Sequence, residues 1–400
     1  MKRKLLAIGS IAFIQLYINA QSKDEVTTVS KTQIDIVYNQ YLQEGDNSAV
    51  TGGIGTERLN VYGPAFNVKR TWKNNTFKVN AGVDIISSAS TDKIDFVMSS
   101  ASILDQRVYA YPVYEHTFEK TGLSVYGGAG ISFESDYLSI GSKIGFTKED
   151  RKNLAQYSAE FQMFNDDLRW GRKLGEWKTL KLLYPQELRT KQWYDTYLRN
   201  SFNLKLGFSK AINKRAIAGI FPMLTYQHGL LATPFHRIYF NDESLAVEQL
   251  PKTRTKLSVG LNYNQFLGSQ LVLKNSINPY IDNWGILAMA VENETAIKLN
   301  MAYTILSNVR FYTQRGTEYF APYKAHTTVE EFYTSDYDLS DYQTYSAGCG
   351  LKFSPYEKFG KRAQFNTLIL RYNFMHRTNG LNAHIMSLSM QLERESKKHP

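Results

Sequence analysis

The sequence predicts an all-β protein: a single closed antiparallel transmembrane β-barrel of about 16 strands, with long external loops and short periplasmic turns. Three observations predict this fold. Apolar and polar residues alternate along most of the chain, long and short connections also alternate, and the chain begins with an export signal. The rest of the sequence has no apolar run of the roughly 20 residues that a transmembrane helix needs.

The N-terminus has the composition of a secretory signal peptide. A positively charged segment at 2–4 precedes a mainly apolar one at 5–17, and Ala20 is a small residue suited to cleavage. The apolar segment is short for an anchor that spans a bilayer with about 20 residues, so we expect cleavage. The expected division of the chain is a signal peptide at 1–20, a periplasmic N-terminal segment at 21–31, the outer-membrane barrel at 32–395 and a charged tail at 396–400.

Alternation with a period of two residues continues from residue 34 to residue 392. In TKLSVGLNYNQ, Leu257 and Leu261 lie on the apolar face of the predicted strand, whereas Lys256 and Ser258 lie on the polar face. About sixteen segments read in this way. They lie near 32–43, 57–72, 76–87, 107–119, 122–134, 137–148, 153–166, 197–210, 215–229, 254–267, 270–281, 286–299, 303–315, 344–354, 363–376 and 382–394.

Three of these segments alternate poorly, and each contains a proline. Pro64, Pro112 and Pro222 cannot donate a ladder hydrogen bond, so they are predicted to mark bulges or local breaks in the ladder.

Aromatic residues are abundant, with 27 Tyr and 22 Phe, although the mean hydropathy is only −0.37. Those near the ends of predicted strands are expected to form girdles at the two membrane interfaces. The residues placed in these girdles are Tyr109, Tyr111, Tyr226, Tyr263, Tyr372 and Phe374.

The connections between segments also alternate in length. Links after odd-numbered segments include three of about 20 residues or more, near 167–196, 230–253 and 316–343, whereas links after even-numbered segments are mostly short, such as KNNT and LGSQ. Outer-membrane barrels have this asymmetry, and their closure leaves no unpaired strand edge in lipid. An even strand count places both termini in the periplasm.

The composition excludes several classes of protein. The single Cys349 rules out a disulfide framework and a cysteine metal site, and by its phase it should face lipid. Removal of the signal peptide lowers the formal net charge from +10 to +7, and the remaining Lys and Arg form no basic run, so no nucleic-acid binding is expected. The sequence has no GxSxG, HExxH or phosphate-binding motif, and its seven histidines are dispersed, so we expect no enzyme.

Three motifs carry a family resemblance: SAVTGGIGTE at 48–57, AGVDIISSASTD at 81–92 and SSASILDQR at 99–107. They resemble an uncharacterised family of predicted bacterial outer-membrane β-barrel proteins that is known by a domain-of-unknown-function label. The resemblance brings no activity, substrate or cofactor with it. Genes of that family often neighbour those for exported thioredoxin-like and flavin-transfer proteins, so the resemblance implies a role in a cell-envelope redox system.

The element SSAS occurs twice where one predicted strand leaves the barrel and the next one returns. Serine and aspartate side chains hydrogen-bond nearby backbone N–H groups in loops, so the two copies are predicted to pair across the external rim. The residues of this rim motif are Ser87, Ser88, Ser90, Ser99, Ser100, Ser102 and Arg107.

Acidic residues in the same stretch offer a second interpretation, a hard-cation site that would bind an ion such as Ca2+. Its ligands would be Asp84, Asp92, Asp95 and Asp105, with Asp46, Asn47 and Glu57 of the neighbouring loop as contributors. No other cofactor is expected. A second acidic stretch, TSDYDLSDY at 334–342, lacks the glycine and terminal glutamate of an EF-hand loop and is predicted to be a solvated external loop.

The predicted lumen carries charges of both signs. Mixed signs suit either ion pairs that brace a filled interior or a selective constriction, and the excess of Lys and Arg slightly favours anionic solutes. The residues predicted to face inward are Lys143, Glu160, Lys205, Lys256, Lys274, Glu292, Glu294, Arg310, Lys352 and Arg371, with Asp35 and Asp84.

Two functions of different class fit this fold. One is a channel for small, preferentially anionic solutes, and the other is a non-conducting structural or docking barrel for a cell-envelope assembly, linked by the resemblance to redox or flavin chemistry. The expected partners are outer-membrane lipid and envelope proteins. A membrane-embedded hydrolase is a third hypothesis, which the absence of a catalytic motif disfavours.

Overall fold

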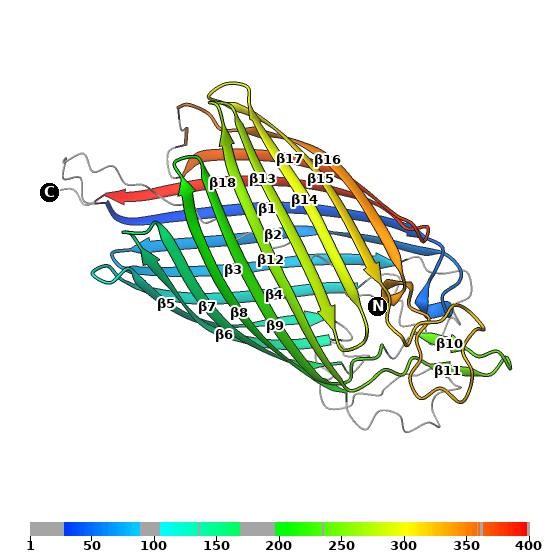
Figure 1. Ribbon diagram of the computed structural model, residues 1–400. Helices are drawn as coiled ribbons and strands as arrows, with labels where there is room; N and C mark the ends of the chain where they lie inside the picture. Colours follow the sequence, from blue (N-terminus) through cyan, green and yellow to red (C-terminus); the bar gives the residue numbers. More distant parts are fainter. Residues whose placement is uncertain are drawn as a thin grey trace.

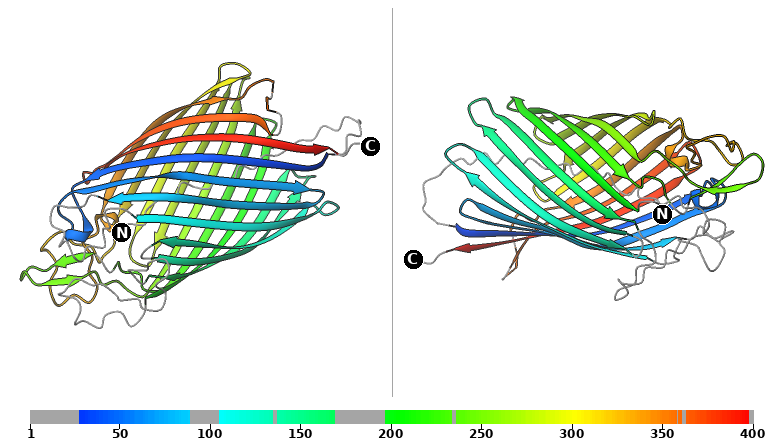
Figure 2. Two further views of the ribbon diagram at one scale, coloured as in Figure 1. Left: turned by 180° about the vertical axis from the view of Figure 1, so that it is seen from behind. Right: turned by 90° about the horizontal axis from the view of Figure 1, so that it is seen from below.

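Sixteen antiparallel strands form a closed barrel (Figure 1). The computed structural model describes residues 28–88, 105–134, 137–168, 197–233, 236–357, 359–360 and 363–397. β1 pairs with β18 in the register Thr28↔Lys397 to Glu44↔Asn382, and this pairing closes the cylinder. The left view of Figure 2 shows these two strands side by side. Every barrel strand therefore has two hydrogen-bonded neighbours, which is what a sheet in lipid requires.

The barrel strands follow one another around the cylinder in chain order. The first eight are β1 (Thr28–Gly45), β2 (Glu57–Trp72), β3 (Asn75–Ser88), β4 (Asp105–Phe118), β5 (Leu123–Glu134), β6 (Tyr137–Asp150), β7 (Ala155–Asp167) and β8 (Leu198–Asn213). The second eight are β9 (Ala216–Gly229), β12 (Thr253–Leu267), β13 (Leu271–Asp282), β14 (Leu287–Lys298), β15 (Tyr303–Arg315), β16 (Tyr342–Phe353), β17 (Gln364–Arg377) and β18 (Asn382–Lys397).

These sixteen strands confirm the predicted segments one by one, most of them to within three residues at each end. The first and last strands are longer than the alternation indicates, because β1 begins at Thr28 and β18 continues to Lys397. All three prolines lie at local gaps in one ladder. Near Pro64, the β2–β3 ladder passes from Tyr62↔Ile85 to Ala65↔Gly82 with no change of register. The β4–β5 and β8–β9 ladders have equivalent gaps at Pro112 and Pro222, so the prolines interrupt pairing without forming bulges.

The outer face of the cylinder is covered with large apolar side chains. Leu257, Leu261 and Ile281 are 42%, 39% and 51% exposed, and Ile144 is 61% exposed. A water-soluble protein would not present so many contiguous apolar side chains to water. The outer surface is therefore suited to lipid, and the chain is an outer-membrane-type β-barrel. No helix among the described residues is both long and apolar enough to cross a membrane.

Two tyrosines depart from the predicted aromatic girdles. Tyr226, Tyr263, Tyr372 and Phe374 are exposed, whereas the placement of Tyr109 and Tyr111 in a girdle is wrong. They alternate with the exposed residues Val108 and Tyr114 and share the face of Arg107, whose guanidinium lies 4.8 Å from the Tyr109 ring centroid.

Tyr111 fills space on the inner side of the wall. A Cβ built on Gly130 of the adjacent strand would lie only 2.0 Å from Cδ1 of Tyr111. The absence of a side chain at Gly130 therefore leaves room for the Tyr111 ring.

The two ends of the barrel differ. We call the end where β1 begins and β18 finishes the terminal end, and the opposite one the loop end. Most links at the terminal end are short, such as 73–74 and 214–215, whereas those at the loop end include 230–252 and 316–341. Antiparallel succession places every odd-numbered link at the loop end, as the sequence predicts.

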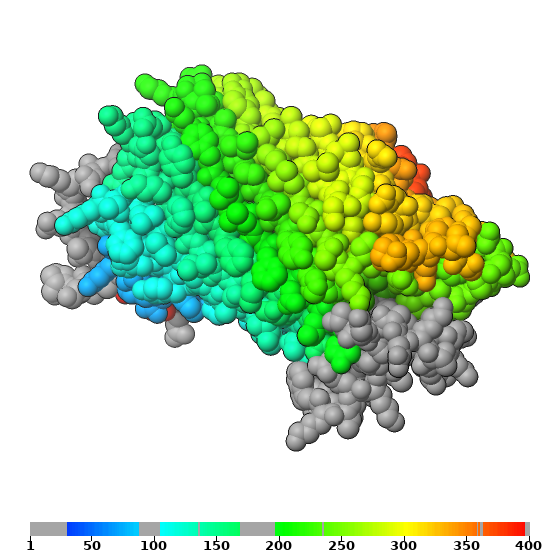
Figure 3. Space-filling model, turned by 60° about the horizontal axis from the view of Figure 1, so that its bottom comes forward, coloured from blue at the N-terminus to red at the C-terminus, as the bar shows by residue number. Residues whose placement is uncertain are grey.

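The long links at the loop end fold together. We call this unit the cap and define it as the described residues of 46–56, 230–252 and 316–341. Link 230–252 forms a small hairpin of β10 (Arg237–Tyr239) and β11 (Leu245–Val247), which the sequence analysis missed. Link 316–341 pairs with it through Gln249 and Tyr333, whose backbone N–H groups donate to each other's carbonyls at 3.1 and 2.8 Å. Link 46–56 contributes the short 3-10 helix η1 (Ala49–Thr51). Figure 3 shows links 230–252 and 316–341 gathered at one end of the molecule.

Candidate functional site at the capped end of the barrel

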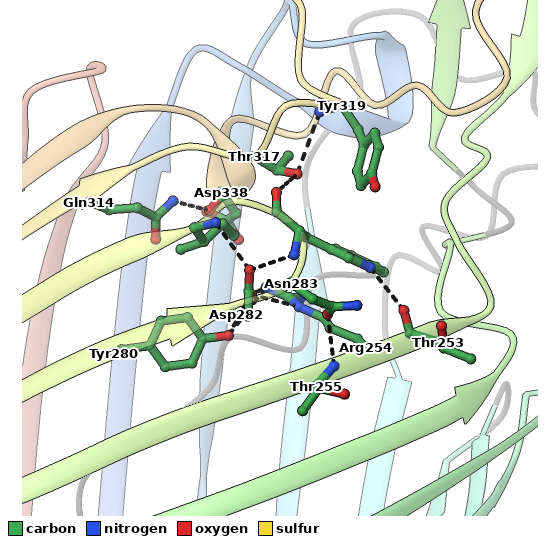
Figure 4. Close-up of polar contacts among 12 residues, drawn as sticks. Thr253, Arg254, Thr255, Tyr280, Asp282, Asn283, Gln314, Thr317, Tyr319 and Asp338 are labelled. Atoms are coloured by element: carbon green, nitrogen blue, oxygen red, sulfur yellow. Dashed lines mark hydrogen bonds and ion pairs between the residues drawn. The ribbon is translucent and has the colours of Figure 1, made fainter.

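Asp282, the last residue of β13, is the centre of a buried polar cluster at the loop end (Figure 4). Its side chain is fully buried. One carboxylate oxygen accepts from Arg254 Nε at 2.9 Å and from the Tyr280 hydroxyl at 2.7 Å. The other accepts from the backbone N–H groups of Trp284 and Ile286 at 3.0 and 3.1 Å. A buried carboxylate with this many donors is stable only as a complete set, so the cluster fixes the β13–β14 turn rigidly.

Trp284 connects this turn to the cap. Its indole Nε1 donates to the carbonyl of Thr253 at 3.0 Å, and its own carbonyl accepts from the Thr317 hydroxyl at 2.6 Å. The guanidinium of Arg254 lies 4.2 Å from its ring centroid. The buried indole also packs in an apolar cluster with Leu230, Ala232, Leu250, Ile286, Ala288 and Leu339. Residues of both long cap links, 230–252 and 316–341, therefore contact Trp284 or pack in its apolar cluster.

A second buried ion pair anchors link 316–341 on the other side. Asp338 in the 3-10 helix η3 (Tyr337–Leu339) pairs with Arg377, the last residue of β17. Gln314 Nε2 donates to the carbonyls of Asp338 and Ser340 at 3.0 and 2.8 Å. The prediction that TSDYDLSDY is a solvated loop is wrong, because Asp336 and Asp338 are buried. Their carboxylates have specific partners inside the cap, so the acidic residues of this stretch do not indicate solvent exposure.

Charged side chains of the barrel wall form separate clusters. Glu160 of β7 pairs with Lys143 of β6 at 3.8 Å and with Lys205 of β8 at 3.3 Å. Glu294 of β14 pairs with Lys274 of β13 at 2.7 Å and with Arg371 at 2.6 Å. Each carboxylate thus bridges two cations from different strands.

The Glu294–Arg371 contact shows which face these side chains occupy. Arg371 lies on β17, which is separated from β14 by β15 and β16, a gap of roughly 14 Å at about 4.8 Å per strand. Side chains on the convex face of a curved sheet diverge, so only the concave face allows this contact. A Cβ built on Gly350 of β16 would lie 3.0 Å from Cγ of Arg371 and 2.8 Å from the Leu370 carbonyl oxygen, so glycine there leaves room for the arginine.

Lys352 belongs to the same region. It experiences the positive charges of Lys274, Lys298 and Arg371 as its electrostatic neighbours. Of the other residues predicted to line the lumen, Glu292 and Arg310 are direct partners in the β14–β15 register, and Lys256 stands opposite both Asp282 and Thr225. Their inward orientation stays a prediction.

The rim motif and the calcium-like site are only partly within the described residues. Asp92, Asp95, Ser90, Ser99, Ser100 and Ser102 lie outside them, and the structure gives only the backbone of Ser88, which pairs with Leu59, as Ser87 pairs with Asn60.

Asp84 and Asp105 are described, and both already have a donor. The Asp84 carboxylate contacts Arg107 Nη1 at 3.3 Å, and the Asp105 carboxylate accepts from its neighbour, the N–H of Gln106, at 2.7 Å. Arg107 also donates to Ser132 at 3.0 Å. The cation site stays a prediction. Arg107, the arginine of the rim motif, pairs with Asp84.

The sequence analysis missed the cluster around Asp282. Its signal is the segment YIDNWGI, in which an aspartate ends a strand and a Trp-Gly pair follows within a short link. Asp is frequent at such turns because its carboxylate accepts a backbone N–H group two residues later, here that of Trp284. That local pattern could have predicted the turn, but not the arginine from β12 or the contact with link 316–341.

Comparison with known proteins gives structural neighbours at low identity. No protein with a curated description shows significant sequence similarity to this chain. A BenF-like porin from Pseudomonas fluorescens Pf-5 is 9% identical with a TM-score of 0.41, covering 92% of this chain and 99% of the porin. OpdQ of Pseudomonas aeruginosa is 9% identical with a TM-score of 0.42, covering 94% of this chain and 100% of OpdQ. A bacterial polysaccharide outer membrane secretin is 8% identical with a TM-score of 0.45, covering 93% and 100%. At these values, nothing about substrates is transferred to this chain.

A family profile, in contrast, matches most of the chain, over residues 99–385. Of the three motifs that carry the resemblance in the sequence, only SSASILDQR at 99–107 lies within this range. The match confirms the family, and the chain belongs to the proteins of unknown function grouped as DUF3570.

Proposed function

We propose that the protein is a channel for small anionic solutes across the outer membrane. The observation that carries the proposal is the cluster around Glu294, whose carboxylate pairs with Lys274 and Arg371, and where Lys298 and Lys352 are further cations nearby. The Glu294–Arg371 pair lies on the concave side of the wall, so the surplus positive charge faces the enclosed space. A cleft lined by one sign of charge concentrates counter-ions.

The Glu160 cluster supports the same selectivity. Lys143 and Lys205 share one carboxylate there, so this ion-pair cluster also has more cations than anions. Each acid orders two long basic side chains and holds their charged ends in place. Fixed cations in a water-filled constriction lower the electrostatic barrier for anions and raise it for cations.

Planar bilayer recording on refolded protein tests this function. Under a salt gradient, the reversal potential should have the sign expected of an anion-selective channel. Lys352→Glu combined with Arg371→Glu should move it toward cation selectivity. Lys324→Glu is the matched control, because Lys324 is an exposed cap residue that pairs with Glu243 at the surface. A wild-type protein that inserts but does not conduct would contradict the proposal.

A docking barrel is the second candidate, and the folded cap favours it. Links 230–252 and 316–341 are held over the loop end by two buried ion pairs and an apolar cluster, which is more order than a simple rim loop needs. This function predicts no conductance and an envelope protein that can be crosslinked to the barrel in cells.

A further inference from the structure

The two long cap links meet at a buried group of three potential metal ligands. His236 and Glu248 come from link 230–252, and Asp336 comes from link 316–341; they are 2%, 2% and 8% exposed. His236 Nδ1 lies 3.3 Å from Glu248 Oε1 and 3.8 Å from Asp336 Oδ2. One ligand atom from each residue lies within 4.8 Å of the others.

Both carboxylates are held in fixed orientations by the surrounding backbone. Glu248 Oε2 accepts the N–H of Thr233 at 2.6 Å, and Asp336 Oδ1 accepts the N–H of Asp338 at 2.9 Å. The Thr334 hydroxyl donates to Glu248 Oε1 at 2.5 Å. Each acid thus keeps one oxygen directed at the imidazole. Hydrogen bonds of this kind orient the ligands in metal sites.

His236 differs from the other buried histidine of the cap. His326 has a partner at each ring nitrogen, the Glu330 carboxylate at 2.6 Å and the Thr334 carbonyl at 2.9 Å. His236 Nε2, in contrast, is buried without a hydrogen-bond partner among the described residues. Buried polar atoms are normally satisfied, so Nε2 is an exception. The ring presents its other nitrogen, Nδ1, to both carboxylates, and Nδ1 is the atom that would bind a metal.

We propose that His236, Glu248 and Asp336 bind one divalent transition-metal ion, Zn2+ above all. Two carboxylates buried side by side are costly, and a dication neutralises both. Ligand atoms around zinc at about 2.0–2.2 Å lie roughly 3.0–3.5 Å apart. The 3.3 Å between His236 and Glu248 already fits this range, and the 3.8 Å between His236 and Asp336 would have to shorten slightly. The imidazole favours zinc over Ca2+, which takes oxygen ligands.

The ion would join two links that are far apart in the chain. Residues 236 and 336 are connected only through strands β12 to β15 and the cap itself. A metal bridge would therefore lock the cap in its folded arrangement, whether the barrel conducts or docks. This inference does not depend on the proposed channel activity.

Zinc titration of tag-free refolded protein, stripped with EDTA, tests the site by calorimetry. We expect one ion per chain for the wild type. Glu248→Gln and Asp336→Asn should each weaken binding by about 100-fold, and Thr334→Ala by about tenfold, the range for loss of an orienting partner. Glu243→Gln is the control, since Glu243 is an exposed cap acid that pairs with Lys324, and its affinity should equal that of the wild type.

X-ray absorption at the zinc edge of the wild-type protein needs no variant, so it does not depend on whether a variant folds. One imidazole nitrogen among oxygen ligands is expected there. Hydrogen exchange should also slow in both 236–252 and 316–341 when zinc is added. Zinc uptake that is unchanged in Glu248→Gln and Asp336→Asn, or an absorption edge without a histidine ligand, would overturn the proposal.

Discussion

Asp282 illustrates how a single residue can organise the mouth of this barrel. Its carboxylate is fully buried and accepts from Arg254, Tyr280 and two backbone N–H groups. Asp282→Asn removes the charge that balances Arg254 and leaves at least one donor unmatched. Breaking a buried ion pair costs about 3–5 kcal/mol. Hydrogen exchange in 316–341 should therefore accelerate strongly. Asp341→Asn is the control, because Asp341 is exposed and accepts a single N–H from Gly316.

Gly350 permits a second residue-scale contact, between Arg371 and Glu294. Gly350→Val introduces a side chain where even a Cβ comes within 3.0 Å of Arg371 Cγ and closer still to a backbone carbonyl. The Arg371 guanidinium should be displaced from Glu294, so that its positive charge is no longer held at this position. We expect weaker anion selectivity in bilayer recordings, with the barrel still able to insert. Unaltered selectivity in this variant would show that Arg371 does not govern permeation.

At the scale of elements, the cap is a folded unit that contains its own pH-sensitive contact. Burial alone would raise the pKa of Glu330, but hydrogen bonds from His326 and from Thr327 outweigh it, so the pKa is held below the ordinary 4.5. A depressed folded-state pKa contributes stability that is present above pH 4.5 and is lost as the pH falls through the folded value.

Acidification below pH 4.5 should therefore loosen the 326–334 segment while the barrel strands stay protected. Hydrogen exchange measured at pH 6 and at successively lower pH values checks this. Glu330→Gln should remove the part of the pH dependence that belongs to this residue. If the segment exchanges equally fast at all these pH values, the contact with His326 does not stabilise the cap.

At the scale of the whole molecule, alternation sorts side chains between lipid and lumen. Leu261 is exposed on the outer face, and Asn262 is its immediate neighbour on the opposite one. Leu261→Arg should destabilise the barrel in bilayers by about 2–4 kcal/mol, the cost of arginine on the lipid face near the midplane. Asn262→Arg is the matched control and should cost far less. Urea titration of the refolded variants in lipid compares them directly; equal costs would contradict the orientation of β12.

The sequence by itself determined the strands, their approximate number and, where the alternation is regular, their apolar face, because a period of two residues is a local property of an extended chain. It also located the long links of the loop end. Only the tertiary structure decided what those links do. Asp336 and Asp338 read as solvated acids until His236 and Arg377, distant in the chain, are brought beside them. Tyr111 reads as an interface aromatic until a facing glycine gives it room inside the wall. Burial and pairing between distant segments depend on how the chain closes in space, and no local pattern records that.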